Sequence, residues 1–203
     1  SKNSLMDKDL PDDPFFLFDI WFKEVNSKNS KSEVNAMTLS TIGLSGYPNG
    51  RIVLLKYYSH NGFVFFTNYN SNKAASIDQN NKVSISFFWE ESERQVIIKG
   101  VAARTSDDFS TKYFNSRPKG SKLGAIVSEN QSSIIKSKDY IVKKFNELSK
   151  EYLNKEISRP DNWGGYIIKP IQYEFWQGGE NRLHDRIRYT LNKNIWQIDR
   201  LSP

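Results

Sequence analysis

The sequence predicts a mainly β protein with α insertions, folded as an antiparallel barrel rather than as a doubly wound parallel sheet. Most of the chain consists of short segments with the alternating pattern, or the β-branched and aromatic content, of strands. The helical segments fall in connections between these strands and do not alternate with them regularly, as a parallel sheet would require. The glycine-rich phosphate loops GxGxxG and GxxxxGK[ST] do not occur in the sequence, so a phosphate would have to be held by side chains.

Each expected element is marked by its own local pattern. Asp12, Asp13 and Pro14 precede a run of apolar and aromatic residues, which predicts an amphipathic helix over 14–26 that docks on the core. Residues 26–35 are polar and rich in Lys, Ser and Asn, which predicts an exposed loop. Further helices are expected over 73–79, from Ser106 to a disturbance near Pro118, and over 138–153. Strands are expected over 36–42, 51–58, 62–68, 82–89, 93–104, 166–169, 171–176, 184–191 and 196–201.

The size and composition of the chain favour one soluble domain over residues 1–203. A chain of 203 residues with 37% hydrophobic and 14% aromatic residues is large enough and apolar enough for one packed core. No apolar run approaches the roughly 20 residues that a membrane helix needs, and the N-terminus has no signal-peptide core. We therefore expect a cytoplasmic protein with no membrane partner.

The net charge and the cysteine and histidine content of the chain indicate which classes of ligand and site to expect. The net charge of +6 favours an anionic partner, and nucleic acid, an acidic membrane surface and phosphorylated small molecules fit it about equally. The absence of cysteine excludes disulfides, thiolate metal sites and a cysteine nucleophile. With only two histidines, a His-rich zinc site is not expected either, so we expect no metal.

The segment 174–186, EFWQGGENRLHDR, is the strongest candidate for a binding site. If it runs as strand, turn and strand, the alternation of side chains places Arg182, His184 and Arg186 on one face. Three potential cations would then share one wall beside Trp176, which favours an anionic and aromatic ligand. The alternative is the solvated face of a surface strand. Core or interface packing is expected for the other tryptophans, Trp21, Trp89, Trp163 and Trp196.

Further basic and hydroxyl residues lie at expected strand ends and turns. Arg51 and Lys56 are five residues apart and would lie on opposite faces of an unbroken strand. They could serve two different anions, or be ordinary edge-strand cations. Thr67 ends one strand and Lys73 begins the next helix, where free backbone N–H groups favour phosphate.

A second set of residues suggests a phosphate cup. Tyr113 and Arg117 are four residues apart and share one face of the helix expected there, and Ser121 follows shortly after. A phenol, a guanidinium and a hydroxyl can together bind a phosphate, although a solvated basic loop has the same composition. Amide and hydroxyl contacts to a heterocycle could come from Gln95, Gln131 and Ser132.

Seven short motifs, most of which contain these candidate binding residues, occur in order along the chain. They are RIVLLK (51–56), FFTN (65–68), ERQV (93–96), YFNSRPKGS (113–121), WGG (163–165), the segment 174–186 and the terminal RLSP. With them the stretch 9–203 resembles the pyridoxamine 5'-phosphate oxidase family. The resemblance implies a homodimeric, FMN-binding split β-barrel with FMN in a cleft between the subunits, and with the strands of 163–203 serving dimerisation and the active site. Where the family usually has an arginine before the lysine of SNKA (71–74), this chain has Asn72.

The resemblance also implies a role for each candidate residue. The FMN phosphate would be held by Arg51, Thr67, Lys73 and Ser132. The rest of the FMN would lie along Ile52, Val53, Leu54, Lys56 and Phe66, with contacts to the flavin ring from Gln95, Gln131, Trp176 and Arg186. The substrate phosphate would be bound by Lys56, Tyr113, Arg117 and Ser121. Arg182 and His184 would lie over the substrate as the catalytic residues.

The reaction implied by the resemblance is the oxidation of pyridoxamine 5'-phosphate or pyridoxine 5'-phosphate to pyridoxal 5'-phosphate. FMN would take a hydride equivalent from C4', and dioxygen would reoxidise it to give hydrogen peroxide. Three alternatives stay open: a sibling FMN oxidase of another substrate, as in phenazine-forming relatives, a non-catalytic carrier of flavin or pyridoxal phosphate, and a nucleic-acid binder. The last is disfavoured, because the basic residues lie in separate motifs rather than in one run.

Overall fold

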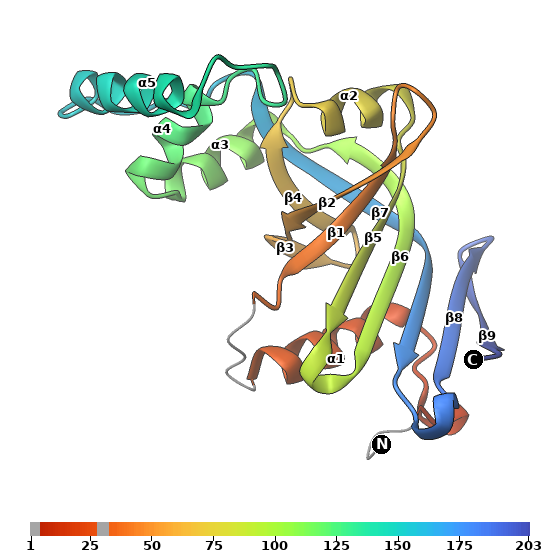
Figure 1. Ribbon diagram of the computed structural model, residues 1–203. Coiled ribbons are helices and arrows are strands. Elements are labelled where there is room, and N and C mark those ends of the chain that lie inside the picture. The colour runs from red at the N-terminus through yellow and green to blue at the C-terminus, as the bar shows by residue number, and fades with distance from the viewer. Residues whose placement is uncertain (1–4, 28–32) are drawn as a thin grey trace.

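The computed structural model describes residues 5–27 and 33–203, which form one curved antiparallel sheet with helices at both of its ends (Figure 1). The expected mainly β fold with α insertions is therefore confirmed. The strands are β1 (Ala36–Ile42), β2 (Pro48–Leu54), β3 (Tyr57–Ser59), β4 (Gly62–Asn68), β5 (Lys82–Trp89), β6 (Arg94–Arg104), β7 (Trp163–Gln177), β8 (Asp185–Asn192) and β9 (Ile195–Leu201). The helices are α1 (Pro14–Ser27), α2 (Asn72–Gln79), α3 (Asp107–Ser116), α4 (Lys119–Val127) and α5 (Lys138–Glu151), and short 3-10 turns lie at Asp7–Asp9, Glu90–Ser92 and Glu180–Arg182.

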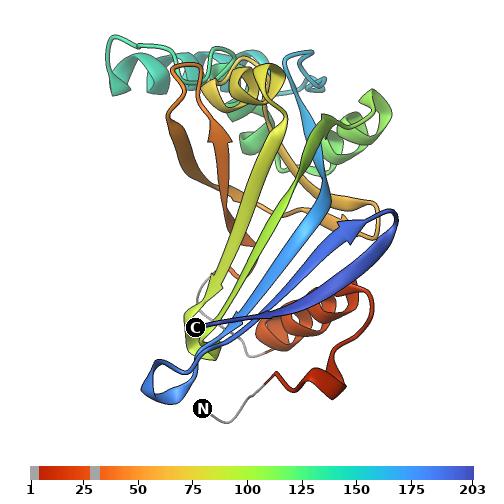
Figure 2. The same cartoon turned by 90° about the vertical axis from the view of Figure 1, so that its right-hand side faces the viewer.

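All nine strands of the described part of the chain belong to a single sheet. Its hydrogen-bonded order is β2-β1-β5-β6-β7-β4-β3, and β8 and β9 continue from β7. Figures 1 and 2 show the sheet curling into a half-barrel, with α1 across one end and α2 to α5 gathered at the other. The long central strands β6 and β7 therefore connect the two ends of the half-barrel.

The first helix closes one end of the sheet. The Asp13 carboxylate accepts a hydrogen bond from the Phe15 N–H at 2.9 Å and satisfies one of the free donors at the helix start. The side chains that recur at helical spacing and are buried against the sheet are Leu17, Phe18, Trp21 and Val25. Burial of each contributes roughly 1.5–3 kcal/mol. The helix expected over 14–26 is thus confirmed as α1, while residues 28–32 of the expected loop lie outside the described residues.

The strand β7 is continuous, whereas the sequence pattern predicts two strands separated at Pro170. Near Pro170 the register with β6 shifts between Lys99 and Gly100. This bulge absorbs the proline, which has no N–H to give to the ladder. β7 also changes its other neighbour along its length, from β4 to β8. The prediction of two strands is therefore wrong, and Trp163 and Trp176 lie near opposite ends of one strand.

Arg51 and Lys56 do not lie on one strand, although the sequence pattern predicts an unbroken strand over 51–58. β2 ends just before Leu55, and β3 begins just after Lys56. The N–H of Leu55 donates to the Asn35 carbonyl at 2.8 Å, and the N–H of Lys56 donates to the Val64 carbonyl at 2.8 Å. The prediction that Arg51 and Lys56 lie on opposite faces of one strand is therefore wrong, because the chain leaves one ladder for another between them.

The helices α3 and α4 form a second, smaller core beside the start of β7. Ser106 caps α3 as expected, since its Oγ accepts from the Phe109 N–H at 3.2 Å. The disturbance expected near Pro118 is the boundary between α3 and α4. The buried residues of this core are Phe114, Leu123, Ala125, Ile157 and Trp163. The helices expected over 73–79 and 138–153 are confirmed as α2 and α5.

Candidate functional site

The main candidate site is a cleft of about 480 Å³ at the end of the half-barrel where α2 to α5 gather (Figure 1). It is formed by β2, β4, the start of α2 and the chain between α3 and α4. Of the residues predicted from the sequence, it brings together Ile52, Val53, Leu54, Lys56, Phe66, Thr67, Lys73, Tyr113, Arg117, Ser121 and Gln131. Both predicted phosphate sites therefore open into the same cleft.

Lys73 lies half-buried in this cleft and contacts neutral groups. Its Nζ donates to Thr67 Oγ1 at 3.2 Å and to Gln131 Oε1 at 3.0 Å. Burial lowers the pKa of Lys73 from its ordinary value, and the positive charge of Arg51 lowers it further. Neither hydrogen-bond acceptor offsets the charge of the ammonium. An anion at this position would do so, and the surroundings of Lys73 therefore fit a phosphate.

Arg117 carries a hydrogen-bond donor that the folded chain does not use. Its guanidinium lies over the ring of Trp163, 4.6 Å from the ring centroid. Its Nη1 is buried and has no hydrogen-bond partner, and burial lowers the pKa of Arg117 from its ordinary value. A buried donor without an acceptor costs about 1–3 kcal/mol. A phosphate oxygen would supply the missing acceptor, so this position also fits an anion.

Tyr113 and Ser121 flank Arg117 on the adjoining helices. The Tyr113 ring stacks on Phe66, with ring centroids 4.0 Å apart. Ser121 lies in the first turn of α4, where the capping residue Pro118 offers no side-chain hydrogen bond. The N–H groups of this turn add to the Ser121 hydroxyl as potential donors. The three residues of the predicted phosphate cup thus come together around one wall of the cleft.

Trp163 lines the cleft, whereas the sequence predicts only core or interface packing for every tryptophan except Trp176. The Trp163 side chain lines the cleft and supports both the Arg117 guanidinium and the Phe66 ring, whose centroid lies 5.4 Å away. The usable signal was the adjacent Gly164 and Gly165. A Cβ at position 165 would collide with the Thr105 hydroxyl, so the chain around Trp163 is packed too closely for larger residues.

Two predicted phosphate ligands, Arg51 and Ser132, do not line this cleft. The Arg51 Nη1 donates to the Leu39 carbonyl at 3.1 Å and to Thr41 Oγ1 at 2.8 Å. Ser132 Oγ accepts a hydrogen bond from the Asn72 N–H at 3.3 Å, at the first residue of α2. Ser132 hydrogen-bonds to the residue that precedes Lys73, and the positive charge of Arg51 is close enough to lower the Lys73 pKa. They border the cleft rather than forming its wall.

A second group of predicted residues lies at the far ends of β6 and β7. Gln95 pairs with Trp176 across these strands, and Trp176 pairs with Arg186 on β8. Directly paired residues of an antiparallel ladder point to the same face, so the three side chains form one row. The Arg186 Nε and Nη2 donate to Glu174 Oε1 at 2.9 and 2.8 Å, which fixes the guanidinium beside Trp176.

Arg182 and His184 do not share a strand face with Arg186, so that prediction is wrong. The chain makes a 3-10 turn at Glu180–Arg182, in which Asn181 and Arg182 have φ values of 54° and 63°. β8 begins only after His184. The alternation rule fails here because the Gly-Gly-Glu-Asn sequence after Gln177 makes a turn, which is a signal that the sequence carried.

His184 nevertheless joins the row, whereas Arg182 is exposed on the turn. The His184 ring packs against the Trp176 ring, with centroids 4.8 Å apart. We call Gln95, Trp176, His184 and Arg186 the strand-end group. Trp176 lies near the Gln177 end of β7, whereas the cleft residue Trp163 lies at its start. At about 3.3 Å per residue, the stretch from Trp163 to Trp176 spans on the order of 40 Å, which is far longer than a mononucleotide.

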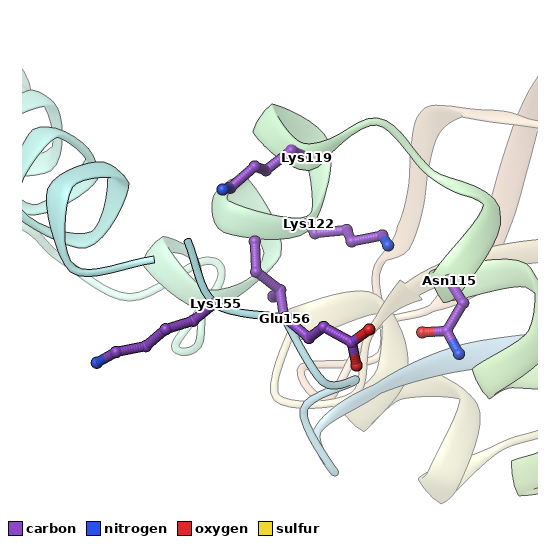
Figure 3. A pocket seen from close by; sticks show the side chains of 6 residues that line it. Asn115, Lys119, Lys122, Lys155 and Glu156 are labelled. Atoms are coloured by element: carbon purple, nitrogen blue, oxygen red, sulfur yellow. The ribbon is translucent and has the colours of Figure 1, made fainter. Parts of the chain in front are cut away.

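Another hollow, of about 380 Å³, lies between α4 and the residues that follow α5 (Figure 3). Three of the side chains that line it are lysines. Lys119 Nζ donates to the Leu153 carbonyl at 2.7 Å. Lys155 points away from the hollow (Figure 3). Its Nζ lies 3.8 Å from Glu151 Oε1. Because these lysines do not converge, the hollow lacks the arrangement of an anion site.

Comparison with protein families matches two regions of the chain. Residues 26–151 match the family model described as pyridoxamine 5'-phosphate oxidase. Residues 163–203 match the model described as the pyridoxine 5'-phosphate oxidase C-terminal dimerisation region. The cleft residues fall mainly in the first region, and most of the strand-end group falls in the second.

Similar proteins and structures agree with these matches. The chain is 54% identical over 202 residues to the pyridoxine/pyridoxamine 5'-phosphate oxidase of Flavobacterium johnsoniae, which covers 99% of this chain and 94% of the relative. It is 51% identical to the enzyme of the same name from Flavobacterium psychrophilum, over 100% of this chain and 94% of the relative. Among solved structures, PhzG from Burkholderia lata 383, in complex with tetrahydrophenazine-1-carboxylic acid, has the same fold, with a TM-score of 0.91 at 24% identity over 99% of this chain and 98% of PhzG. On the strength of the two family regions and the full-length relatives, this chain belongs to the pyridoxamine 5'-phosphate oxidase family.

Proposed function

We propose that this protein is an FMN-dependent oxidase that converts pyridoxine 5'-phosphate and pyridoxamine 5'-phosphate to pyridoxal 5'-phosphate. The names of its full-length relatives support the substrates. The observation that carries the proposal is the cleft itself, in which Lys73 and Arg117 provide two separate positions for an anion. Two phosphorylated ligands, a cofactor and a substrate, account for both positions.

The residues around Lys73 would hold the phosphate of FMN. Thr67 and Gln131 already orient the Lys73 ammonium, and Arg51 and Ser132 border the same place. The apolar side chains that continue the cleft are Ile52, Val53, Leu54 and Phe66. A phosphate beside Lys73 would offset the repulsion between the charges of Lys73 and Arg51, which supports the binding of the FMN phosphate at this position.

The residues around Arg117 would hold the phosphate of the substrate. The unpaired Nη1 of Arg117, the Tyr113 phenol and the Ser121 hydroxyl supply donors on one wall, and Lys56 adds a further cation. A guanidinium can bind two phosphate oxygens at once and therefore fixes orientation as well as position. The substrate ring would then extend from this wall towards the FMN position.

The protein acts as a homodimer, since it carries the dimerisation region of its family. Within one chain the strand-end group is too distant to reach a ligand in the cleft. In a two-fold dimer, the strand-end group of one protomer can approach the cleft of its partner, and the same contact is repeated on the other side. We propose that each of the two sites is completed in this way, with Gln95, Trp176 and Arg186 beside the flavin ring.

Bound FMN supplies the acceptor for a hydride equivalent from C4' of the substrate, and we propose dioxygen as the final acceptor, with hydrogen peroxide as product. With the amine substrate, water then supplies the aldehyde oxygen and the nitrogen leaves as ammonia. The task of the protein is to hold C4' in place, to exclude water and to supply hydrogen bonds and charge around the ring. Arg117 anchors the phosphate end, and Arg182 and His184 would lie over the ring as the catalytic residues. The Arg182 side chain is exposed on its turn in the single chain, as a residue that meets a partner protomer would be.

The test is an absorbance spectrum of the purified protein, followed by anaerobic addition of pyridoxamine 5'-phosphate. Flavin bands that bleach with substrate and return with air support the oxidase. Bands that stay unbleached favour a sibling oxidase of another substrate or a carrier, and a protein that cannot be reconstituted with FMN refutes the proposal. No helix in the described part of the chain could cross a membrane, and the cytoplasmic location stays a prediction.

A further inference from the structure

The turn between β7 and β8 orients the ring of His184. The backbone N–H of Gly179 donates a hydrogen bond to His184 Nδ1 at 3.1 Å. The Trp176 ring also contacts the imidazole, and the two ring centroids lie 4.8 Å apart. The hydrogen bond and the ring contact together orient the imidazole, and Nε2 is the ring nitrogen that Gly179 does not contact.

We infer that Gly179 holds neutral His184 in the tautomer protonated on Nε2, so that His184 offers an N–H donor, and not a lone pair, to its ligand. A nitrogen that accepts an N–H must have a free lone pair, so Nδ1 carries no proton. The neutral imidazole has one proton, which therefore lies on Nε2. Gly179 is thus a positioning residue, and the part of the inference that concerns the substrate rests on the proposed function.

The turn that carries Gly179 is fixed by buried hydrogen bonds at its base. The Gly178 N–H donates to the Glu93 carbonyl at 2.7 Å. The Gln177 side-chain amide donates to the same carbonyl at 3.2 Å, and its Oε1 accepts from Arg94 Nε at 2.9 Å. Gln177 and Arg94 are both buried. The N–H of Gly179 is therefore presented from a rigid base rather than from a free loop.

Glycine is required at this position because of space, since its φ of −129° is open to any residue. A Cβ at position 179 would collide with the carbonyl oxygen of Leu183, which belongs to the same turn. A Cβ at position 178 would lie 2.8 Å from the Glu93 Cβ. The close turn that brings the Gly179 N–H to His184 thus depends on both glycines.

The other histidine of the chain, His60, provides a comparison for the tautomer of His184. His60 Nδ1 lies 3.3 Å from the Asp13 carboxylate, and a carboxylate oxygen can only accept. Neutral His60 should therefore favour a proton on Nδ1, which is the opposite tautomer. The sequence contains only these two histidines, so their nitrogen signals can be told apart by one variant, His60→Gln.

The experiment is long-range ¹H–¹⁵N correlation NMR of the uniformly labelled full-length protein, at a pH about two units above the ordinary histidine pKa of about 6.5. The expected result is one unprotonated Nδ1 and one protonated Nε2 for His184, together with a coupling across the hydrogen bond between the Gly179 nitrogen and His184 Nδ1. A protonated Nδ1, an averaged pair of signals or the absence of that coupling overturns the inference. No substrate is needed, so this outcome is independent of the oxidase test.

A pair of variants tests the consequence for the reaction. A glutamine side chain can place an N–H close to the position of Nε2, whereas the asparagine amide reaches only to the position of Nδ1. His184→Gln should therefore retain about tenfold more of the rate of anaerobic flavin reduction than His184→Asn. Equal rates, or a faster His184→Asn, would show that the Nε2 donor is not what the reaction uses.

Discussion

Replacing Lys73 with methionine separates its use in ligand binding from its contribution to the fold. The variant keeps the apolar stem and loses the ammonium that donates to Thr67 and Gln131. Burial and the charge of Arg51 lower the pKa of Lys73 below its ordinary value of 10.5. Between the lowered pKa and 10.5 the unfolded chain binds more protons than the folded chain, so the stability of the FMN-free protein rises with pH there. At neutral pH the charged Lys73 therefore lowers the free energy of unfolding.

The loss in the Lys73→Met variant should fall on FMN binding. An ammonium and a phosphate about 4 Å apart attract each other by about 4 kcal/mol at an effective dielectric constant of about 20. After desolvation, a hydrogen bond to a charged group contributes about 1.5–3 kcal/mol. FMN should thus bind about 10- to 150-fold more weakly. The free energy of unfolding of the FMN-free protein should change by less than about 1 kcal/mol, because the removed charge and the two lost hydrogen bonds act in opposite directions.

Two titrations of the FMN-free protein measure these quantities. Quenching of FMN fluorescence gives Kd, and urea unfolding gives the free energy of unfolding. Lys143→Met is the matched control, because it removes the same charge from the exposed surface of α5. Wild-type FMN affinity in Lys73→Met, or a loss of more than about 2 kcal/mol of stability, would refute the assignment of Lys73 to an anion.

Four further outcomes are expected. FMN affinity of the wild-type protein should fall as pH rises through the lowered pKa of Lys73, because the anion binds the charged form, while Lys73→Arg should give a flatter profile; identical profiles would contradict this. Arg117→Met should raise KM for pyridoxamine 5'-phosphate about 10- to 150-fold in initial-rate assays with FMN affinity unchanged, and a parallel loss of FMN would place Arg117 at the cofactor instead. Arg182→Ala should keep FMN bound and slow its anaerobic reduction in stopped-flow traces, whereas FMN loss equal to that of Lys73→Ala would remove the distinction between the two residues. A random mixture of Arg117→Met and Arg186→Ala chains should reach about a quarter of wild-type activity, because about half of its dimers would be mixed and each mixed dimer would hold one complete site of two; no recovery on mixing would argue that each chain holds its own site.

The elements that the sequence predicted well are those fixed by local patterns. α1 was predictable because its apolar residues repeat at helical spacing after a proline at the first turn. The continuity of β7 was not predictable, because a proline such as Pro170 normally indicates the end of a strand. What keeps the strand continuous is the bulge opposite Gly100 on β6, which is a partner far away in sequence. Local rules cannot supply information that resides in the neighbouring strand.

The candidate site divides in a similar way. The main cations of the cleft were predictable from local patterns, since Lys73 lies at a helix start, where free N–H groups favour anions, and Arg117 follows Tyr113 at a spacing of four residues. The prediction that Arg182 and Arg186 share one strand face is wrong, because the alternation of side chains does not continue through the turn that follows the glycine pair. The separation of the cleft from the strand-end group could not be predicted either, because it depends on how far β7 runs without interruption.

The length of β7 couples assembly of the protein to cofactor binding. If FMN contacts both the cleft at Trp163 and the strand-end group at Trp176, it must bridge two chains. A ligand that binds the dimer and not the monomer stabilises the dimer, by about 2.7 kcal/mol per site at a concentration of 100 times Kd. Linkage makes this effect reciprocal, so dimer formation raises FMN affinity by the ratio of the Kd of the monomer to the Kd of the dimer. Interface substitutions remote from the cleft therefore weaken FMN binding, and substitutions of Lys73 weaken the dimer, because the same contacts contribute to both equilibria.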